Sequence, residues 1–342
     1  MNPTVTLGNT EITVNKNGFG ALPIQRISTE EAKKLLLKAY HAGINFFDTA
    51  RFYTDSEEKI GKALSSVRNH IYIATKTGAQ KAEDFWKDLH TSLTLLNTDY
   101  IDLYQFHNPS FCPKPEDGTG LYEAMLEAKK QGKIRHIGIT NHRLKVAHEA
   151  IDSRLYETMQ FPFCYLATEK DKEIVTRCQK EKMGFISMKA LSGGLITNSA
   201  AAYAFQAQYD NVLPIWGIQR ESELDEFLSY ITNPPTMTPE ISELIALDRA
   251  QLAGNFCRGC GYCVPTCPVG IEINNCARMS LLLRRSPSEL QLTSEVQEKM
   301  KKIENCIHCN QCISHCPYGL DTPKLLEENY KDYKEVLAGK VL

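Results

Sequence analysis

The sequence predicts an α/β protein: a closed (β/α)8 TIM barrel followed by a smaller, mostly helical unit. Three observations lead to this fold class. Eight short apolar runs alternate with segments of helical periodicity between Gly18 and Ile231. No G-x-G-x-x-G motif opens the first strand-helix turn, which disfavours the alternative, an open doubly wound sheet. Of the 12 cysteines, eight gather in two similar runs near the C-terminal end.

Each expected strand is a short apolar run bounded by polar or turn-forming residues. An additional apolar alternation at 5–14, with Gly8 and Asn9 at its turn, predicts an N-terminal β-hairpin that plugs the bottom of the barrel. The eight barrel strands are expected at 18–24, 44–50, 71–76, 101–107, 134–140, 157–161, 184–190 and 212–218.

Helices are expected between successive strands, where apolar residues recur every three or four positions. In TEEAKKLLLKAYHAG, for example, Ala32, Leu35, Leu36 and Ala39 share one face and Gly43 offers a C-terminal stop. The helical segments are expected at 29–43, 56–67, 82–96, 121–131, 144–153, 170–182 and 221–231.

The polar, proline-rich stretch TNPPTMTPE at 232–240 marks the expected domain boundary. It separates a barrel domain at 1–235 from a cysteine-rich domain at 236–342. The composition, 42% hydrophobic and 23% charged with a formal net charge of -2, is typical of soluble proteins and excludes a basic nucleic-acid surface. No apolar run approaches the ~18 residues of a membrane span, and no basic start precedes an apolar core. A cytoplasmic location is expected.

Two runs, CRGCGYCVPTCP and CIHCNQCISHCP, share the pattern C-x2-C-x2-C-x3-C-P. This is the bacterial spacing for [4Fe-4S] clusters, in which three thiolates of a run hold one cube and the fourth ligates the other cube. Structural zinc and disulfides are the alternatives. The spacing therefore predicts two metal centres with crossed ligand sets. The first set is Cys257, Cys260, Cys263 and Cys316, and the second is Cys306, Cys309, Cys312 and Cys267.

Polar side chains occur where the second, third and fourth strands end, which is where barrels of this kind carry their chemistry. Asp48, Lys76 and His107 lie at these ends, and Tyr53 follows Asp48 by five residues. Taken singly, each has a structural explanation, such as a turn cap or a surface lysine. Their occurrence at successive strand ends favours an active site.

The segment FDTARFYTDSEEKIGKAL resembles the DTA-x-x-Y-x-x-E-x-x-x-G segment of the aldo-keto reductase superfamily. IATK, YQFHN, GITN and the Gln of MQF follow in the order typical of that superfamily, so the resemblance covers nearly all of 1–231. It implies an oxidoreductase that reduces a carbonyl, or oxidises an alcohol, with NAD(P)H. It also implies a catalytic tetrad of Asp48, Tyr53, Lys76 and His107.

Carbonyl reduction gives each member of this tetrad a role. Hydride delivered to a carbonyl carbon leaves negative charge on oxygen, so a proton donor must stand nearby, and Tyr53 is the candidate. A phenol has a pKa near ~10, which the ammonium of Lys76 is expected to lower. Asp48 is expected to keep Lys76 charged, and His107 to orient the carbonyl oxygen.

The resemblance also assigns coenzyme contacts. Thr140, Asn141 and Gln160 correspond to the side chains that hold the nicotinamide carboxamide, although the superfamily more often has Ser where Thr140 stands. Ser192 begins a Ser-Gly-Gly run expected near the pyrophosphate. Arg220 is the candidate for a 2'-phosphate, but its surroundings depart from the superfamily pattern, so the choice between NADP(H) and NAD(H) stays open.

The cysteine-rich domain, with helical patterns at 276–285 and 288–303, resembles the helical dicluster ferredoxins attached to fumarate reductases and similar complexes. A nicotinamide passes two electrons as hydride, whereas a cube passes one. Three hypotheses follow: a carbonyl reductase with an appended cluster domain, a barrel linked to its clusters through a flavin or substrate radical with an external ferredoxin as partner, and a non-catalytic electron-transfer scaffold. The complete tetrad argues against the third.

Overall fold

The computed structural model describes residues 4–192, 196–252, 256–259, 261, 263–285, 288–316 and 318–340. These residues form two compact units, and the division between them lies after Ser242, within helix α9 (Pro239–Leu252). In the described part of the chain, no helix is long and apolar enough to span a membrane.

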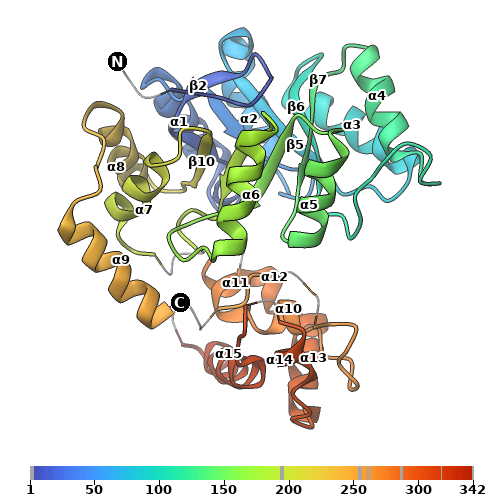
Figure 1. Ribbon diagram of the computed structural model, residues 1–342, viewed down its shortest axis with the longest axis vertical. Coiled ribbons are helices and arrows are strands. Elements are labelled where there is room, and N and C mark those ends of the chain that lie inside the picture. The colour runs from blue at the N-terminus through green and yellow to red at the C-terminus, as the bar shows by residue number, and fades with distance from the viewer. Residues whose placement is uncertain are drawn as a thin grey trace. The chain divides into compact units, whose positions relative to one another are not determined.

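Eight parallel strands in the described residues of the first unit close into a barrel, in the order β10-β3-β4-β5-β6-β7-β8-β9 (Figure 1). The predicted (β/α)8 barrel is confirmed, and the open doubly wound sheet is excluded. Because the strands are parallel, their carboxyl ends meet at one rim. The strands are β3 (Gly18–Gly20), β4 (Phe46–Asp48), β5 (Tyr72–Thr77), β6 (Ile101–His107), β7 (Ile134–Thr140), β8 (Thr158–Pro162), β9 (Gly184–Met188) and β10 (Val212–Gly217).

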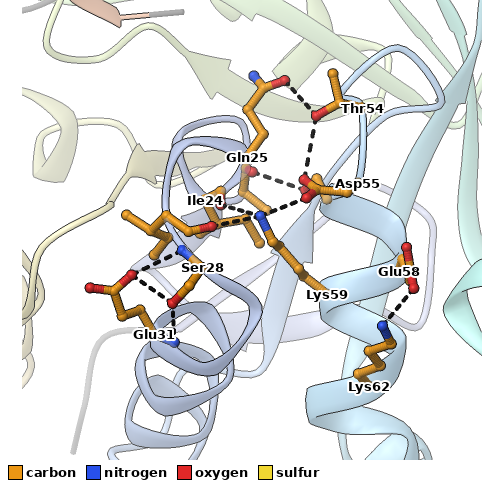
Figure 2. Close-up of polar contacts among 12 residues, drawn as sticks. Ile24, Gln25, Ser28, Glu31, Thr54, Asp55, Glu58, Lys59 and Lys62 are labelled. Atoms are coloured by element: carbon orange, nitrogen blue, oxygen red, sulfur yellow. Dashed lines mark hydrogen bonds and ion pairs between the residues drawn. The ribbon is translucent and has the colours of Figure 1, made fainter. Parts of the chain in front are cut away.

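Helices connect the strands and bury one face each. Helix α1 begins after Ser28, whose hydroxyl accepts from the backbone N of Glu31 at 3.2 Å, while the Glu31 carboxylate accepts from the backbone N of Ser28 at 2.9 Å (Figure 2). Ala32 and Leu36 on its inner face are fully buried. The helices are α1 (Thr29–His41), α2 (Ser56–Leu64), α3 (Ala82–Leu96), α4 (Leu121–Lys130), α5 (Leu144–Ser153), α6 (Glu169–Lys180), α7 (Ser199–Ala207) and α8 (Glu221–Thr232), with 3-10 turns η1 (Pro23–Arg26) and η2 (Ser65–His70).

An antiparallel hairpin of β1 (Thr4–Thr6) and β2 (Thr13–Asn15) precedes the barrel. Its buried Val5 and Val14 pack in one cluster with Phe46, the first residue of β4. Gly8 turns the hairpin with a φ of 59°, and a Cβ there would overlap the backbone just before β9. The hairpin therefore closes the amino-terminal end of the barrel, as predicted, and leaves the carboxyl rim for chemistry.

The loop after β4 is tied to neighbouring elements from both sides. The Lys59 ammonium, on α2, donates to the carbonyl oxygens of Ile24 at 3.1 Å and Ile27 at 2.7 Å. It also pairs with Asp55 Oδ2 at 2.8 Å (Figure 2). The Lys59 side chain is only 4% exposed. This lysine therefore joins the segment after β3 to the loop that carries Tyr53.

The described residues of the second unit form helices and no strand, which agrees with the predicted mostly helical domain. Met300 and Leu326 are among the most deeply buried side chains of its core. Besides the rest of α9, its helices are α10 (Ile273–Cys276), α11 (Met279–Arg285), α12 (Ser288–Gln291), α13 (Ser294–Lys301), α14 (Gln311–Ser314) and α15 (Thr322–Leu337), with the 3-10 turn η3 (Lys302–Asn305).

Candidate active site and metal centres

A buried ion pair lies at the carboxyl rim between two adjacent strands. Asp48 is the last residue of β4, and Lys76 lies one residue before the end of β5. The Lys76 Nζ is 2.7 Å from each carboxylate oxygen of Asp48 and donates to the carbonyl of Thr49 at 2.6 Å. Burial raises the pKa of Asp48 and lowers that of Lys76, and the mutual attraction of the two groups opposes both shifts.

Tyr53 returns to this pair from the loop after β4. Its backbone N donates to Ala50 O at 3.0 Å, and its carbonyl accepts from Ser56 N at 2.8 Å, so the chain turns back toward the barrel. The Lys76 Nζ lies 5.4 Å from the centroid of the Tyr53 ring. Tyr53, Lys76 and Asp48 thus come together although they lie on different elements.

The pKa of Tyr53 is raised, first by burial of the phenol and then by the negative charge of Asp48. The expectation that Lys76 lowers this pKa is therefore wrong for the chain as it stands here. Burial of the phenol is the larger cause, and Asp48, which holds the Lys76 ammonium with both oxygens, adds its negative charge to the rise. Tyr53 is consequently a protonated phenol at neutral pH.

His107, the last residue of β6, completes the group. Its ring meets the edge of the Tyr53 ring with centroids 5.8 Å apart, and the 64% exposed Phe52 stacks on it at 5.6 Å. Burial, with the nearby charge of Lys76, lowers the pKa of His107 to about 3. Its buried Nδ1 has no hydrogen-bond partner within the described residues. A neutral imidazole therefore faces the rim beside the phenol.

Residues outside the predicted tetrad support this group. The carboxylate of Glu57 pairs with Arg51 and accepts from Thr75 Oγ1 at 2.6 Å and Ser92 Oγ at 2.7 Å. Gln105, two residues before His107 on β6, donates to Gln160 Oε1 at 2.8 Å. The alternation of side chains along a strand places Gln105 on the same face as His107, and this signal could have identified it.

The side chains predicted to hold the carboxamide occupy the next part of the rim, and all are buried. Thr140 ends β7, and its hydroxyl lies 3.8 Å from Met188 Sδ. The Asn141 amide donates to Pro109 O at 2.8 Å, and its oxygen accepts from two backbone N–H groups of the following loop. The Gln160 amide lies against Asp48, where it opposes the rise of the carboxyl pKa. Asn141 and Gln160 therefore already have protein partners.

The two residues predicted for the phosphates differ in their surroundings. Ser192 is 4% exposed with a φ of 49°, and its buried Oγ has no hydrogen-bond partner within the described residues. The two glycines that follow it lie outside those residues. Arg220, whose side chain is 70% exposed, pairs with Glu223 at 2.7 Å at the start of α8. A phosphate at this position would compete with the Glu223 carboxylate for the Arg220 guanidinium.

Cysteines of both sequence runs line two small cavities in the second unit, called cavity 1 and cavity 2 below. Cavity 1 is lined by Cys257 and Cys263 from the first run and by Cys316 from the second. Cys260, the remaining member of the predicted first set, lies outside the described residues. The cysteines that line cavity 2 are Cys267, Cys306, Cys309 and Cys312.

The described residues around cavity 2 supply the four thiols that a [4Fe-4S] cube needs, and those around cavity 1 supply three. Thiols from three positions of one run and one position of the other are the donor set that such cubes require. Backbone N–H groups already point at two of the sulfurs, from Gly259 to Cys257 Sγ at 3.3 Å and from Ile271 to Cys267 Sγ at 3.4 Å. Ile273 lines both cavities, so the two sites are neighbours.

Fold and site together define a barrel with a Tyr, Lys, Asp and His group at its carboxyl rim, joined to a cysteine-lined helical unit. The family model described as the Aldo/keto reductase family matches residues 16–202, more than half of the 342 residues. The chain belongs to the aldo/keto reductase family, and its predicted enzyme class is confirmed at that level. A second model, described as a 4Fe-4S dicluster domain, matches residues 256–321 and confirms the predicted fusion.

Similar proteins include L-galactose dehydrogenase from Arabidopsis thaliana, 30% identical over 56% of this chain and 66% of its own length. An uncharacterised oxidoreductase from Bacillus subtilis is 28% identical over 60% of this chain and 70% of its own length. The chain thus spans about two thirds of the length of these relatives.

Among solved structures, an aldo-keto reductase from Bacillus halodurans in its holo form has a TM-score of 0.64 at 21% identity, covering 72% of this chain and 96% of that one. An aldo-keto reductase from Klebsiella pneumoniae in complex with NADPH has a TM-score of 0.62 at 22% identity, covering 73% of this chain and 95% of that one. At these identities the likeness shows the fold.

Proposed function

We propose that the barrel reduces the carbonyl group of a small molecule with NADPH or NADH, or catalyses the reverse oxidation of an alcohol. The observation that carries this proposal is the convergence of Tyr53, the Asp48–Lys76 pair and His107 at three adjacent strand ends. Membership of the aldo/keto reductase family supports it. The NADPH bound to the Klebsiella pneumoniae protein supports a nicotinamide coenzyme.

In this proposal the coenzyme, when bound, supplies a hydride, and the chain handles the proton. Tyr53 donates its phenolic proton to the carbonyl oxygen as negative charge develops there. Its raised pKa keeps that proton in place until the oxygen becomes basic. The neutral His107, with a pKa near 3, binds the same oxygen through a ring nitrogen without competing as an acid.

The ion pair then has a role after proton transfer. A phenolate formed at Tyr53 would lie close to the ammonium of Lys76, whose Nζ is 5.4 Å from the ring centroid. Asp48 holds that ammonium in position and opposes the loss of its proton on burial. The pair thus stabilises the charge that appears on Tyr53 only as the reaction proceeds, which is the condition for accelerating the chemical step.

For the coenzyme, we propose that Thr140, Asn141 and Gln160 surround the carboxamide. We also propose that the Ser192 hydroxyl, which has no hydrogen-bond partner within the described residues, binds a phosphate oxygen. Arg220 would have to leave Glu223 to bind a 2'-phosphate, so we propose only modest discrimination between NADPH and NADH. In the second unit, we propose that the cysteines around cavities 1 and 2, together with Cys260, hold two [4Fe-4S] clusters for one-electron transfer.

Substitution of Tyr53 by Phe tests the acid. Removing only the phenolic hydroxyl should lower kcat for reduction of methylglyoxal or benzaldehyde by about 10²-fold or more, the usual contribution of a positioned acid. Coenzyme binding, followed by nicotinamide fluorescence, should change by less than about twofold, because the hydroxyl acts at the carbonyl.

The matched control is Tyr72→Phe, at the amino-terminal end of β5, where the barrel carries no rim chemistry. It should leave both measurements unchanged. Normal turnover by Tyr53→Phe would mean that Tyr53 is not the proton donor.

A further inference from the structure

The two cysteine-lined cavities differ in the charge that surrounds them. Arg258 lines cavity 1, where its guanidinium stacks on the Tyr318 ring at 4.1 Å from the centroid. The described residues that line cavity 2 include no arginine, lysine, aspartate or glutamate. A groove outside cavity 2, near Cys306, is lined by both Lys334 and Glu304, so charge of both signs is present there. Among the described residues that line the two cavities, Arg258 at cavity 1 is the one permanent cation.

A second arginine, Arg278, lies against the same cysteine loop. A Cβ added at Gly259, between Cys257 and Cys260, would overlap the Arg278 guanidinium, so the two are in close contact. Gly259 also has a φ of 73°, which favours glycine. Its backbone N donates to Cys257 Sγ at 3.3 Å. The loop from Cys257 to Gly259 thus has the cysteine thiol and the Arg278 guanidinium on adjoining sides.

Arg278 has the features of a group that acts on a buried anion. Its guanidinium lies against the backbone of Gly259, two residues after Cys257. Its Nε is buried and makes no hydrogen bond within the described residues. A guanidinium remains charged under any condition in which the protein is folded. Arg278 therefore places a fixed positive charge against the loop that carries Cys257, which lines cavity 1.

From this arrangement we propose that Arg278 raises the reduction potential of the cluster in cavity 1 above that of the cluster in cavity 2. Reduction adds one negative charge to a cube, and nearby positive charge and hydrogen bonds to its sulfurs stabilise the reduced form. Water at the exposed Cys309 favours reduction in cavity 2, but the other three cysteines there are half-buried. Arg278 lies in contact with the loop that carries Cys257, and Coulomb attraction is stronger inside a protein than in water, so we expect its charge to have the larger effect.

The difference in reduction potential sets the direction of electron transfer between the two clusters. One electron, received by the cluster in cavity 2 from a low-potential one-electron carrier protein, passes to the cluster in cavity 1, so the first is reoxidised and the second reduced. No bond or proton changes place in this step. The inference rests on the proposed binding of two clusters, and iron and sulfide analysis tests that binding separately.

The experiment is an anaerobic redox titration of the full-length protein, followed by electron paramagnetic resonance. The native protein should show two reduced-cluster signals with separate midpoint potentials. Cys309→Ser removes a proposed ligand of the cavity 2 cluster only, so it should perturb the signal of that cluster. The unperturbed signal then belongs to the cavity 1 cluster, and it should be the one with the higher midpoint potential. Arg278→Gln should lower that higher potential, changing the ratio of reduced to oxidised cluster about tenfold, or 59 mV for a one-electron couple, and leave the lower one in place.

Arg284→Gln is the matched control, because Arg284 pairs with Asp332 at 2.7 Å, whereas Arg278 lies against Gly259 of the cysteine loop. It should shift neither potential. Arg278→Lys keeps the charge and should retain most of the separation even if Arg278→Gln loses iron. Equal potentials in the native protein, or a higher potential for the cavity 2 cluster, would overturn the asymmetry. An unchanged higher potential in a cluster-loaded Arg278→Gln protein would overturn the role of Arg278. Failure of the two-cluster proposal would give a different result, because the native protein would then contain no iron.

Discussion

At the scale of single residues, the pKa of Tyr53 has a consequence for the direction of catalysis. Reduction needs the protonated phenol, whereas alcohol oxidation needs the phenolate as a base. Burial and the charge of Asp48 raise this pKa, so the phenol predominates at neutral pH. In the mechanism we propose, this ionisation state favours reduction over oxidation.

This preference predicts opposite pH dependences for the two directions. For carbonyl reduction, kcat/KM should show no alkaline loss from Tyr53 below about pH 10, the usual phenol value. Alcohol oxidation should rise about tenfold per pH unit toward that value, because the phenolate fraction rises in that proportion. His107, with its pKa lowered to about 3, should add no limb between pH 5 and 9. An alkaline loss of reduction centred near neutrality would contradict the raised pKa.

The sequence could locate these residues but could not determine their ionisation. The order of Asp48, Tyr53, Lys76 and His107 along the chain placed them at adjacent strand ends. The pKa of Tyr53 depends on its burial and on its distances from the charges of Lys76 and Asp48. Only the folded chain provides those distances. Arg278 was missed for a similar reason, because its contact with Gly259 joins two segments that carry no shared motif.

At the scale of elements, the long periodic segments were the most predictable. The strands Ile101–His107 and Ile134–Thr140 and the helices Ala82–Leu96 and Leu144–Ser153 have the expected bounds. Helix α7 (Ser199–Ala207) was missed, because SAAAYAFQA is buried on nearly all sides and has no polar face to reveal a helical period.

Other element boundaries shifted where tertiary contacts decide them. The apolar run at 18–24 forms a strand only as far as Gly20, since Pro23 begins a 3-10 turn. In the cysteine-rich unit, the single helices expected at 276–285 and 288–303 are each divided in two. Helix α15 (Thr322–Leu337) was not expected, although its apolar residues recur with helical spacing.

Lys59 provides a prediction at this scale, because it joins the segment after β3 to the loop of Tyr53. Lys59→Met would leave the buried carbonyl of Ile24 and the carboxylate of Asp55 without their cation. Unfolding by urea should show a loss of about 1.5–3 kcal/mol, the range for hydrogen bonds to charged groups. The kcat for carbonyl reduction should fall as well, since the loop would hold Tyr53 less firmly.

Lys62→Met is the matched control on the same helix (Figure 2). Lys62 is 54% exposed and pairs with Glu58 one turn away at 2.6 Å. Such surface pairs contribute about 0.3–0.5 kcal/mol. Equal effects of the two substitutions would mean that Lys59 does not join the two segments.

Glu157, just before β8, predicts a pH-dependent contribution to stability. Burial opposes ionisation, but hydrogen bonds from His136, Lys129 and the Ile137 N–H lower its pKa to about 2. A carboxyl with a lowered pKa stabilises the folded state above its unfolded pKa of 4.5, and this contribution is lost as pH falls toward about 2.

Glu157→Gln should therefore reduce the free energy of unfolding by about 1–2 kcal/mol at pH 7, after allowance for partial exposure. The difference in free energy of unfolding between Glu157→Gln and the native protein should become smaller as pH falls below about 4.5. Glu83→Gln, whose carboxylate is 86% exposed, is the control and should have little effect at either pH. A constant difference across this range would contradict the assigned cause.

At the scale of the whole molecule, the chain combines a family known for two-electron chemistry with a unit suited to single electrons. Anaerobically purified protein should contain about eight irons and eight sulfides per chain, as two cubes require. Cys316→Ser should lower the iron content, because Cys316 lines cavity 1.

Cys276→Ala is the control for this count. Cys276 is buried in the same unit but lines neither cavity, so its removal should leave the iron content unchanged. Stoichiometric zinc in place of iron would contradict the cluster assignment.

The crossing of cysteines between the two cavities also bears on how the protein is made. A ribosome completes the whole barrel and the first cysteine run before it reaches Cys316, which lines cavity 1 with Cys257 and Cys263. Cavity 2 likewise waits for the second run to join Cys267. Neither proposed cluster site can acquire its full set of sulfur donors before the second run is made, so we expect metal insertion to follow the synthesis of both runs. A nascent chain interrupted before the second run would already contain the complete barrel sequence and could not complete either cluster site.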